Sequence, residues 1–223
     1  MLLKDKVMVI TGGLGVLGQG VARIAQREGA RVILLDIIDA PDGAVGEPMR
    51  VDLLSESSLA GCFEQIGEFH ILANIAGGFD MGPTVYTTED EKWDAMFAIN
   101  VTTLRRTLKA AVPYLLEQGR GSIINVGAAA AARGVANLSS YLAAKSTVMR
   151  LTEALSEEVK AQGINVNAVL PSVIDTPRNR ADMPSADFGH WVAPEDLGDV
   201  ICFLGSERAR AIHGALVPVT GLS

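Results

Sequence analysis

The chain has 223 residues, 48% of them hydrophobic, and a formal net charge of −7. It can bury a sizeable core, yet it has no uninterrupted apolar stretch long enough to span a bilayer, so a membrane protein is not expected. The acidic balance leaves no basic patch for nucleic acid, and the two cysteines and three histidines fit no zinc-binding spacing.

The amino-terminal residues show no signal-peptide pattern, so we expect a cytoplasmic protein, and they lead directly into a predicted strand at 6–10. A glycine-rich turn and a predicted helix at 16–28 follow. Glycines let the backbone approach a pyrophosphate closely, and the start of the helix directs free N–H groups at that anion. The turn supplies Gly12, Gly13, Gly15, Leu17 and Gly18 as candidate cofactor-binding residues. An ordinary glycine-rich turn is the alternative.

The second predicted strand, 31–36, ends in a carboxylate. Asp36 follows Gly18 by 18 residues, where a dinucleotide-binding fold places the acid that binds the adenosine ribose hydroxyls. A 2′-phosphate at that point would be repelled by about 4 kcal/mol per charge pair at an effective dielectric constant of ~20. No cation is close in sequence to offset this repulsion, so Asp36 favours NAD over NADP. A carboxylate that merely ends a strand is the alternative.

The rest of the chain continues the alternation of strands and helices. Strands are predicted at 48–52, 69–75, 121–127, 164–170 and 214–219, and helices at 55–66, 89–117, 138–161 and 194–206. This pattern predicts an α/β fold, a single Rossmann-type domain over 1–223 with a doubly wound parallel sheet of about seven strands and helices on both faces. Pro113 should bend or loosen the long helix at 89–117. The irregular stretch 171–193 is a candidate lid over the site.

Tyr141 and Lys145 are the most informative pair in the chain. They are four residues apart within a predicted helix, so their side chains leave the same face. An ammonium a few Å away can lower the pKa of a phenol from ~10 by roughly one to three units, which makes the tyrosine a usable proton donor near neutral pH. Two common residues at this spacing also occur on solvated helix faces. The glycine-rich turn earlier in the chain favours the catalytic interpretation of the pair.

Together these motifs resemble the short-chain dehydrogenases/reductases over nearly the whole length. The resemblance implies hydride transfer between NAD(H) and a small carbonyl or alcohol substrate, with Tyr141 exchanging the proton, and a homodimer or homotetramer built through the two long helices. It also implies roles for matching positions: Lys145 on the nicotinamide ribose, Asn100 holding a water of the proton relay, Asp52 and Leu53 at the adenine, Asn74, Ala76 and Gly77 beneath the dinucleotide, and Pro171, Ile174 and Thr176 near the nicotinamide.

One position departs from the family pattern. The catalytic serine of the family normally lies thirteen residues before the tyrosine, and here that residue is Ala128. The stretch 175–191 is similar to a segment of dihydropteridine reductases, which the likeness implies to carry alanine there, so NADH-dependent reduction of a quinonoid dihydropterin is an alternative. A nucleotide-binding sensor or scaffold without turnover is another. Candidate walls of the substrate pocket are Phe79, Ala128, Met183, Phe188 and Trp191, although the larger four suit lid or core packing equally well.

Overall fold

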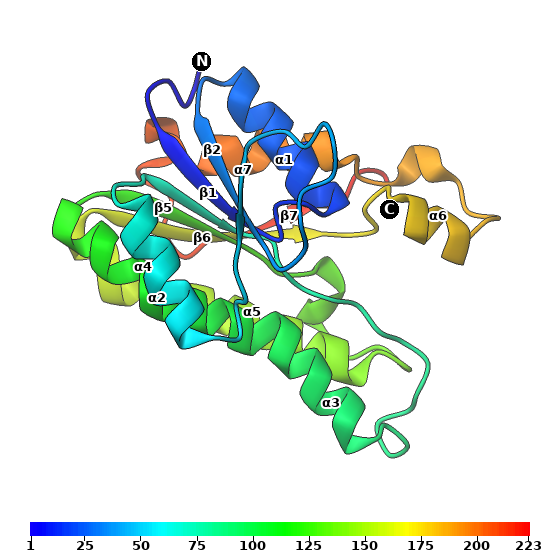
Figure 1. Ribbon diagram of the computed structural model, residues 1–223. Helices are drawn as coiled ribbons and strands as arrows, with labels where there is room; N and C mark the ends of the chain where they lie inside the picture. The colour runs from blue at the N-terminus through cyan, green and yellow to red at the C-terminus, as the bar shows by residue number, and fades with distance from the viewer.

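The computed structural model describes residues 1–223 and is built on one sheet of seven parallel strands (Figure 1). The strand order is β3-β2-β1-β4-β5-β6-β7. The strands are β1 (Val7–Thr11), β2 (Arg31–Asp36), β3 (Glu47–Arg50), β4 (Ile71–Asn74), β5 (Gly121–Val126), β6 (Ile164–Pro171) and β7 (Leu216–Val219). The order reverses between β1 and β4, which is the arrangement of a Rossmann-type sheet. The predicted fold class is confirmed.

Helices cover both faces of the sheet (Figure 1). One layer holds α1 (Val16–Arg27) and α7 (Pro194–Leu204), and the other holds α2 (Glu56–Ile66), α4 (Thr103–Gln118) and α5 (Ser139–Val159). Because parallel strands are buried on both faces, successive residues of one strand enter opposite cores. In β1, Met8 packs into the core beneath α1 and α7, whereas Val9 packs into the core beneath α2 and α4. No helix combines the length and hydrophobicity needed to cross a membrane.

The long helix predicted at 89–117 is interrupted, but not where the sequence suggested. It consists of α3 (Asp90–Phe97), a π-helical turn (Ala98–Thr102) and α4. Pro113 is exposed within α4, which continues through it, so the proline does not end the helix, and a bend or loosening there stays a prediction. In the π-helical turn, the Asn100 amide Nδ2 donates to Met96 O at 3.0 Å and to Gly78 O at 3.1 Å. π-helical turns are rare and often mark functional sites.

No helix joins β2 to β3. Parallel neighbours usually need a crossover of a dozen or more residues, yet residues 37–46 make this connection as a loop. The loop leaves Ile37 and Ile38 more than half exposed, and the strands pair in a register that sets Asp36 opposite Arg50. A cation therefore lies beside Asp36, which corrects the expectation that none was near.

The candidate lid at 171–193 contains a short helix, α6 (Pro177–Asp182), that the sequence analysis left irregular. The Thr176 hydroxyl accepts from the Asn179 N–H at 3.1 Å, and Pro177 occupies the first helical turn, where its missing N–H is harmless. The two ends of the segment are joined because Asp175 N donates to Val192 O at 2.8 Å and Val192 N donates to Val173 O at 3.0 Å. The segment is thus a closed loop fixed at its base.

Candidate active site

The glycine-rich turn, residues 12–18, forms a concave backbone surface between β1 and α1 that few side chains cover, called the cradle below. Gly12 has a positive φ of 64°, and a side chain there would press on the Ala76 backbone at 2.9 Å. A side chain at Gly18 would overlap the Gly12 carbonyl. Helix α1 begins without a side-chain cap, so no side chain occupies the N–H groups of its first turn. Leu17 packs its side chain against the core and offers only its backbone to a ligand. These features fit a pyrophosphate.

Asp36 is held against this turn. Its Oδ2 accepts from Leu14 N at 3.0 Å and its Oδ1 accepts from Ile37 N at 2.9 Å, so the carboxylate has a fixed orientation at the end of β2. Arg50, opposite it on β3, reaches Asp39 instead, with 3.4 Å between Nη1 and Oδ1. Both partners of that ion pair are largely exposed. The guanidinium is therefore loosely bound and close to the place where a ribose would meet Asp36.

The segment after β4 makes a polar floor beside the cradle. The Thr11 hydroxyl accepts from Ile75 N at 3.1 Å and from Ala76 N at 3.3 Å, which ties this segment to β1. Asn74 donates from Nδ2 to Asn125 Oδ1 at 2.9 Å, while its own Oδ1 is buried without a partner. A buried acceptor without a donor is costly, so this oxygen marks a position that a ligand or water would stabilise. Thr11 and Asn125 were not predicted from the sequence to belong to the site, and the structure adds them to it.

Asp52 and Leu53 lie just beyond β3. Asp52 is exposed, and its Oδ1 accepts from Leu54 N at 2.8 Å, so the carboxylate caps a local turn. Leu53 lines a small polar cavity together with Thr11, Asn74 and Lys145. Leu53 thus lies close to the end of β1, and the contact of both residues with an adenine stays a prediction.

Tyr141 lies at the start of α5 in an apolar setting. The rings of Phe79 and Tyr141 meet edge to face, with 4.9 Å between centroids and an interplanar angle of 76°. Ala128 belongs to the small buried cluster against which Tyr141 also packs. Burial raises the pKa of Tyr141 to about 12. Of the predicted pocket residues, Phe79 contacts the Tyr141 ring, and Ala128 belongs to the cluster on which Tyr141 packs.

Lys145 is buried one helical turn further on. Its Nζ donates to Val126 O at 2.8 Å, and burial lowers its pKa to about 8. The predicted lowering of the Tyr141 pKa is wrong for this structure, because the ammonium bonds to a carbonyl and burial dominates both groups. A Cβ on Gly77 would lie 3.3 Å from Lys145 Nζ and 2.7 Å from Asn100 Oδ1. Gly77, Asn100 and Lys145 thus converge on one point.

The Asn100 side chain is fully engaged with the protein. Its Oδ1 accepts from Gly78 N at 3.2 Å, and its Nδ2 donates to Gly78 O and Met96 O. These bonds fix the backbone next to Phe79. That Asn100 holds a water of a proton relay stays a prediction.

The lid residues pack on one another. Arg180 forms a two-point ion pair with Asp175, at 2.6 and 2.7 Å, and its guanidinium lies 4.8 Å from the centre of the Phe188 ring. Phe188 in turn packs on Trp191, with 4.8 Å between centroids. Thr176 caps α6 and Met183 ends it, 38% exposed. Contacts within the lid thus explain most of the stretch that resembles dihydropteridine reductases.

Comparison with known proteins places these features in a family. A family model described as enoyl-(acyl carrier protein) reductase matches residues 15–221. A short chain dehydrogenase, adrF, of Penicillium roqueforti is 30% identical over 98% of this chain and 96% of its own length. The 2-(S)-hydroxypropyl-CoM dehydrogenase 3 of Xanthobacter autotrophicus is also 30% identical, with the same coverage. Both alignments span 247 residues, more than this chain has, so the relatives carry residues without a counterpart here.

A solved structure agrees. A Beutenbergia cavernae protein with NADP bound at low occupancy has a TM-score of 0.88 and 25% identity, over 98% of this chain and 96% of that one. The names of these relatives give no support to the dihydropteridine reductase alternative. Sequence, fold and relatives agree on a broader assignment: the chain belongs to the short-chain dehydrogenase/reductase family of oxidoreductases.

Proposed function

We propose that the protein is an NAD(H)-dependent oxidoreductase that interconverts a small carbonyl compound and its alcohol, with Tyr141 as proton donor and acceptor. The observation that carries this proposal is the position of Tyr141. Its partly exposed ring packs edge to face on Phe79 and lies one helical turn from Lys145. The Lys145 ammonium lies close to Gly77, in the segment beside the dinucleotide cradle. A bound nicotinamide would supply or accept the hydride. The relatives' names, dehydrogenases among them, support the reaction class.

The chain's own residues have distinct tasks in this proposal. The first turn of α1 binds the pyrophosphate and Asp36 binds the adenosine ribose. Tyr141 is protonated at neutral pH, and burial, which raises its pKa to about 12, strengthens this preference. It donates its proton to the substrate oxygen during reduction. The reverse reaction needs the phenolate, which burial disfavours and which Lys145 would favour only if its ammonium left Val126 O for the phenol. Ala128 provides no hydroxyl, so Tyr141 is the principal donor to the substrate oxygen.

The test is NADH oxidation over a panel of diketones, quinones, 3-oxoacyl thioesters and a quinonoid dihydropterin. We expect at least one carbonyl substrate to be reduced, and Tyr141→Phe to lower kcat/KM at least ~100-fold, as loss of a general acid does. Tyr86→Phe is the matched control, because that phenol is 87% exposed, and it should keep full activity. Equal rates for wild type and Tyr141→Phe would remove the phenol from the mechanism. NADH binding without turnover of any compound would favour the sensor alternative.

Cofactor choice is the second part of the proposal. We expect NADH to be preferred, because the fixed Asp36 carboxylate repels a 2′-phosphate. Arg50 moderates this preference, since its weak pair with Asp39 leaves it able to turn toward such a phosphate. The NADP bound to the Beutenbergia protein shows that a similar fold accepts the phosphate.

Binding titrations followed by NADH and NADPH fluorescence check this preference. Asp36→Ala should shift the ratio of the two Kd values toward NADPH by roughly tenfold or more, which corresponds to ~1.4 kcal/mol. Arg50→Gln should shift it the other way. A wild-type protein that already binds NADPH more tightly would contradict the role of Asp36.

A further inference from the structure

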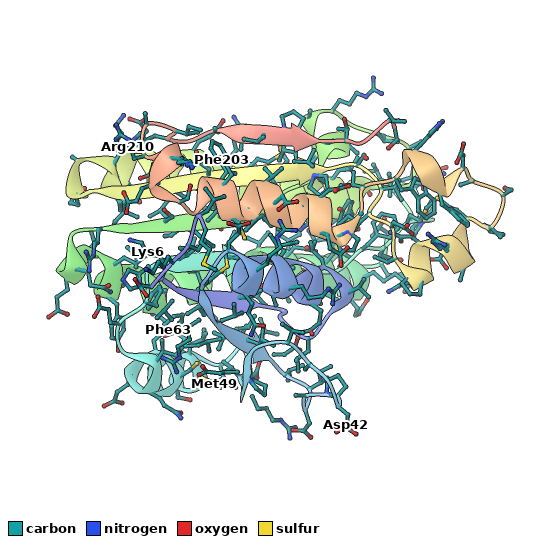
Figure 2. The ribbon with its side chains drawn as sticks, turned by 90° about the horizontal axis from the view of Figure 1, so that it is seen from above. Lys6, Asp42, Met49, Phe63, Phe203 and Arg210 are labelled. Carbon is teal, nitrogen blue, oxygen red and sulfur yellow. The ribbon has the colours of Figure 1, made fainter.

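A second hollow lies at the end of the sheet opposite the candidate active site. It is lined by 13 residues, none of them hydrophobic. Figure 2 shows two of them, Lys6 and Arg210, at one end of the molecule, while α6 and the lid lie at the other. Since all strands are parallel, this is the edge where the strands begin, and the cradle and Tyr141 lie where they end.

Five neighbouring strands each bring a basic side chain to this edge. Lys6 precedes β1, His70 precedes β4 and Arg120 precedes β5. Lys160 comes shortly before β6, and Arg210 and His213 come before β7. Because β1, β4, β5, β6 and β7 follow one another in the sheet, these groups form a row with a spacing of about 5 Å between strands. The chain as a whole is acidic, whereas this edge gathers four Lys and Arg side chains.

Carboxylates balance only part of this charge. Four of the lining residues are Lys or Arg, and the only acid among the lining residues is Glu207, 3.1 Å from Lys6 Nζ. Just outside, Glu68 lies 3.3 Å from Arg120 and 3.7 Å from His70 Nε2, and Glu157 pairs with Lys160. Three of the four cations therefore have a carboxylate partner, and Arg210 has none. No carboxylate lies within 4.0 Å of Arg210 or His213. An ammonium has three N–H donors and a guanidinium five, so donors remain free even where a pair exists.

Hydrogen bonds hold the residues at the base of the hollow in place. Val7 N donates to His70 Nδ1 at 3.1 Å, so the neutral imidazole carries its proton on Nε2 as a further donor. Burial, followed by the charge of Lys6, lowers the pKa of His70 and keeps it neutral at physiological pH. Asn165 donates to Ala209 O at 3.2 Å and to Ile212 O at 2.9 Å, which holds the segment that carries Arg210. The His70 ring and the backbone segment that carries Arg210 are therefore held in place by the protein itself.

We propose that this hollow is a binding site for a small polyanion that carries two or more phosphate groups, separate from the dinucleotide site. Adjacent phosphates match a row of cations and neutral N–H donors that are spaced along one sheet edge, and guanidinium groups bind phosphate oxygens at two points. The proposal is independent of the proposed enzyme activity, because no residue of the hollow belongs to the candidate active site.

Inorganic pyrophosphate is the probe, tested by calorimetric titration and thermal unfolding of the full chain at pH 7.5 without divalent metal. We expect saturable binding that raises Tm, and an affinity reduced roughly tenfold or more in Arg210→Gln, since a charge-assisted hydrogen bond contributes that much. Arg120→Gln should weaken binding similarly. Arg208→Gln is the matched control, because Arg208 is exposed two residues from Arg210 but does not line the hollow, and it should bind as wild type.

Three outcomes would overturn the proposal. Loss of the pyrophosphate effect in saturating NAD⁺ would place the ligand in the glycine-rich turn. An equal Tm rise in sodium chloride of the same ionic strength would show general screening only. Equal affinity of Arg210→Gln, Arg120→Gln and Arg208→Gln would show that the row of cations does not form the site.

Discussion

At the scale of single residues, burial controls the two groups on which the proposed chemistry depends. It raises the pKa of the Tyr141 phenol to about 12 and lowers the pKa of the Lys145 ammonium to about 8. Both shifts favour the neutral form, because a charge is poorly solvated in the interior. The tyrosine therefore holds its proton, and the lysine changes charge close to physiological pH. A buried lysine with these properties costs stability at neutral pH.

Replacing Lys145 with methionine should remove a dependence of stability on pH. The folded pKa of about 8 lies below the unfolded value of 10.5, so the unfolded chain binds more protons between these values and wild-type stability gains as pH rises through that window. The free energy of unfolding of wild type, relative to Lys145→Met, should therefore rise by up to about 3 kcal/mol from pH 8 to 10.5. Chemical denaturation at several pH values measures this.

Burial raises the pKa values of Tyr141, Cys62 and Cys202 in both proteins, so these groups lower stability as pH rises. Subtracting the free energy of unfolding of Lys145→Met from that of wild type cancels this opposing effect. Lys109→Met is the control, because its ammonium is exposed and paired with Glu56, and it should show no such rise. A flat difference between pH 8 and 10.5 would mean that Lys145 is not desolvated.

At the scale of elements, two short irregularities shape the site. The π-helical turn at Ala98–Thr102 brings the Asn100 amide to the Gly78 backbone and so positions Phe79 against Tyr141. The lid is held in shape by Arg180, which joins Asp175 near its base to Phe188 further along. Helix α6 alone has six residues and is too short to be stable without these contacts.

Arg180→Leu should loosen the lid while leaving the protein folded. Because Arg180 is about half exposed, losing its ion pair should change global stability by less than ~1 kcal/mol. Faster hydrogen exchange across 177–191 and a higher KM are the expected effects, with kcat changed less. Arg178→Leu is the matched control, since Arg178 is more exposed, makes only a 3.7 Å contact with Asp182 and lies over no aromatic ring. Equal exchange in both variants would show that Arg180 does not hold the lid.

At the scale of the whole molecule, the sheet separates two ends with different chemistry. The ends of the strands carry the cradle, Tyr141 and the lid, and their beginnings carry the basic hollow. The apolar stripe of α4 is largely buried in the chain's own core through Leu104, Ala111 and Leu115. Association would therefore use other apolar side chains of the long helical segment, among them Ile99 and Leu116, each about two-fifths exposed.

We expect a homodimer or homotetramer, so sedimentation equilibrium should give two or four times the chain mass of 23.5 kDa. Leu116→Asp should shift this equilibrium toward smaller species, because a charge would replace a contacting apolar group. Leu222→Asp, at a carboxyl-terminal residue 77% exposed, is the control and should leave the mass unchanged. A wild-type mass of one chain at micromolar concentrations would contradict this assembly.

The sequence by itself determined the order of strands and helices, the glycine-rich cradle and the presence of Asp36 at a strand end. These features depend on hydrophobic periodicity, turn residues and spacings within a few tens of residues, all of which are local. The cap at Thr176 is equally local, although α6 was missed inside a stretch without hydrophobic periodicity.

Only the tertiary structure determined which residues that are distant in sequence lie side by side. The β2–β3 register set Arg50 opposite Asp36, and packing brought Phe79 onto Tyr141 across more than sixty residues of sequence. The direction of the Tyr141 pKa depends on burial and on the bond of Lys145 to Val126 O, neither of which a four-residue spacing reveals. The row of cations likewise exists only because a parallel sheet gathers the beginnings of distant strands at one edge.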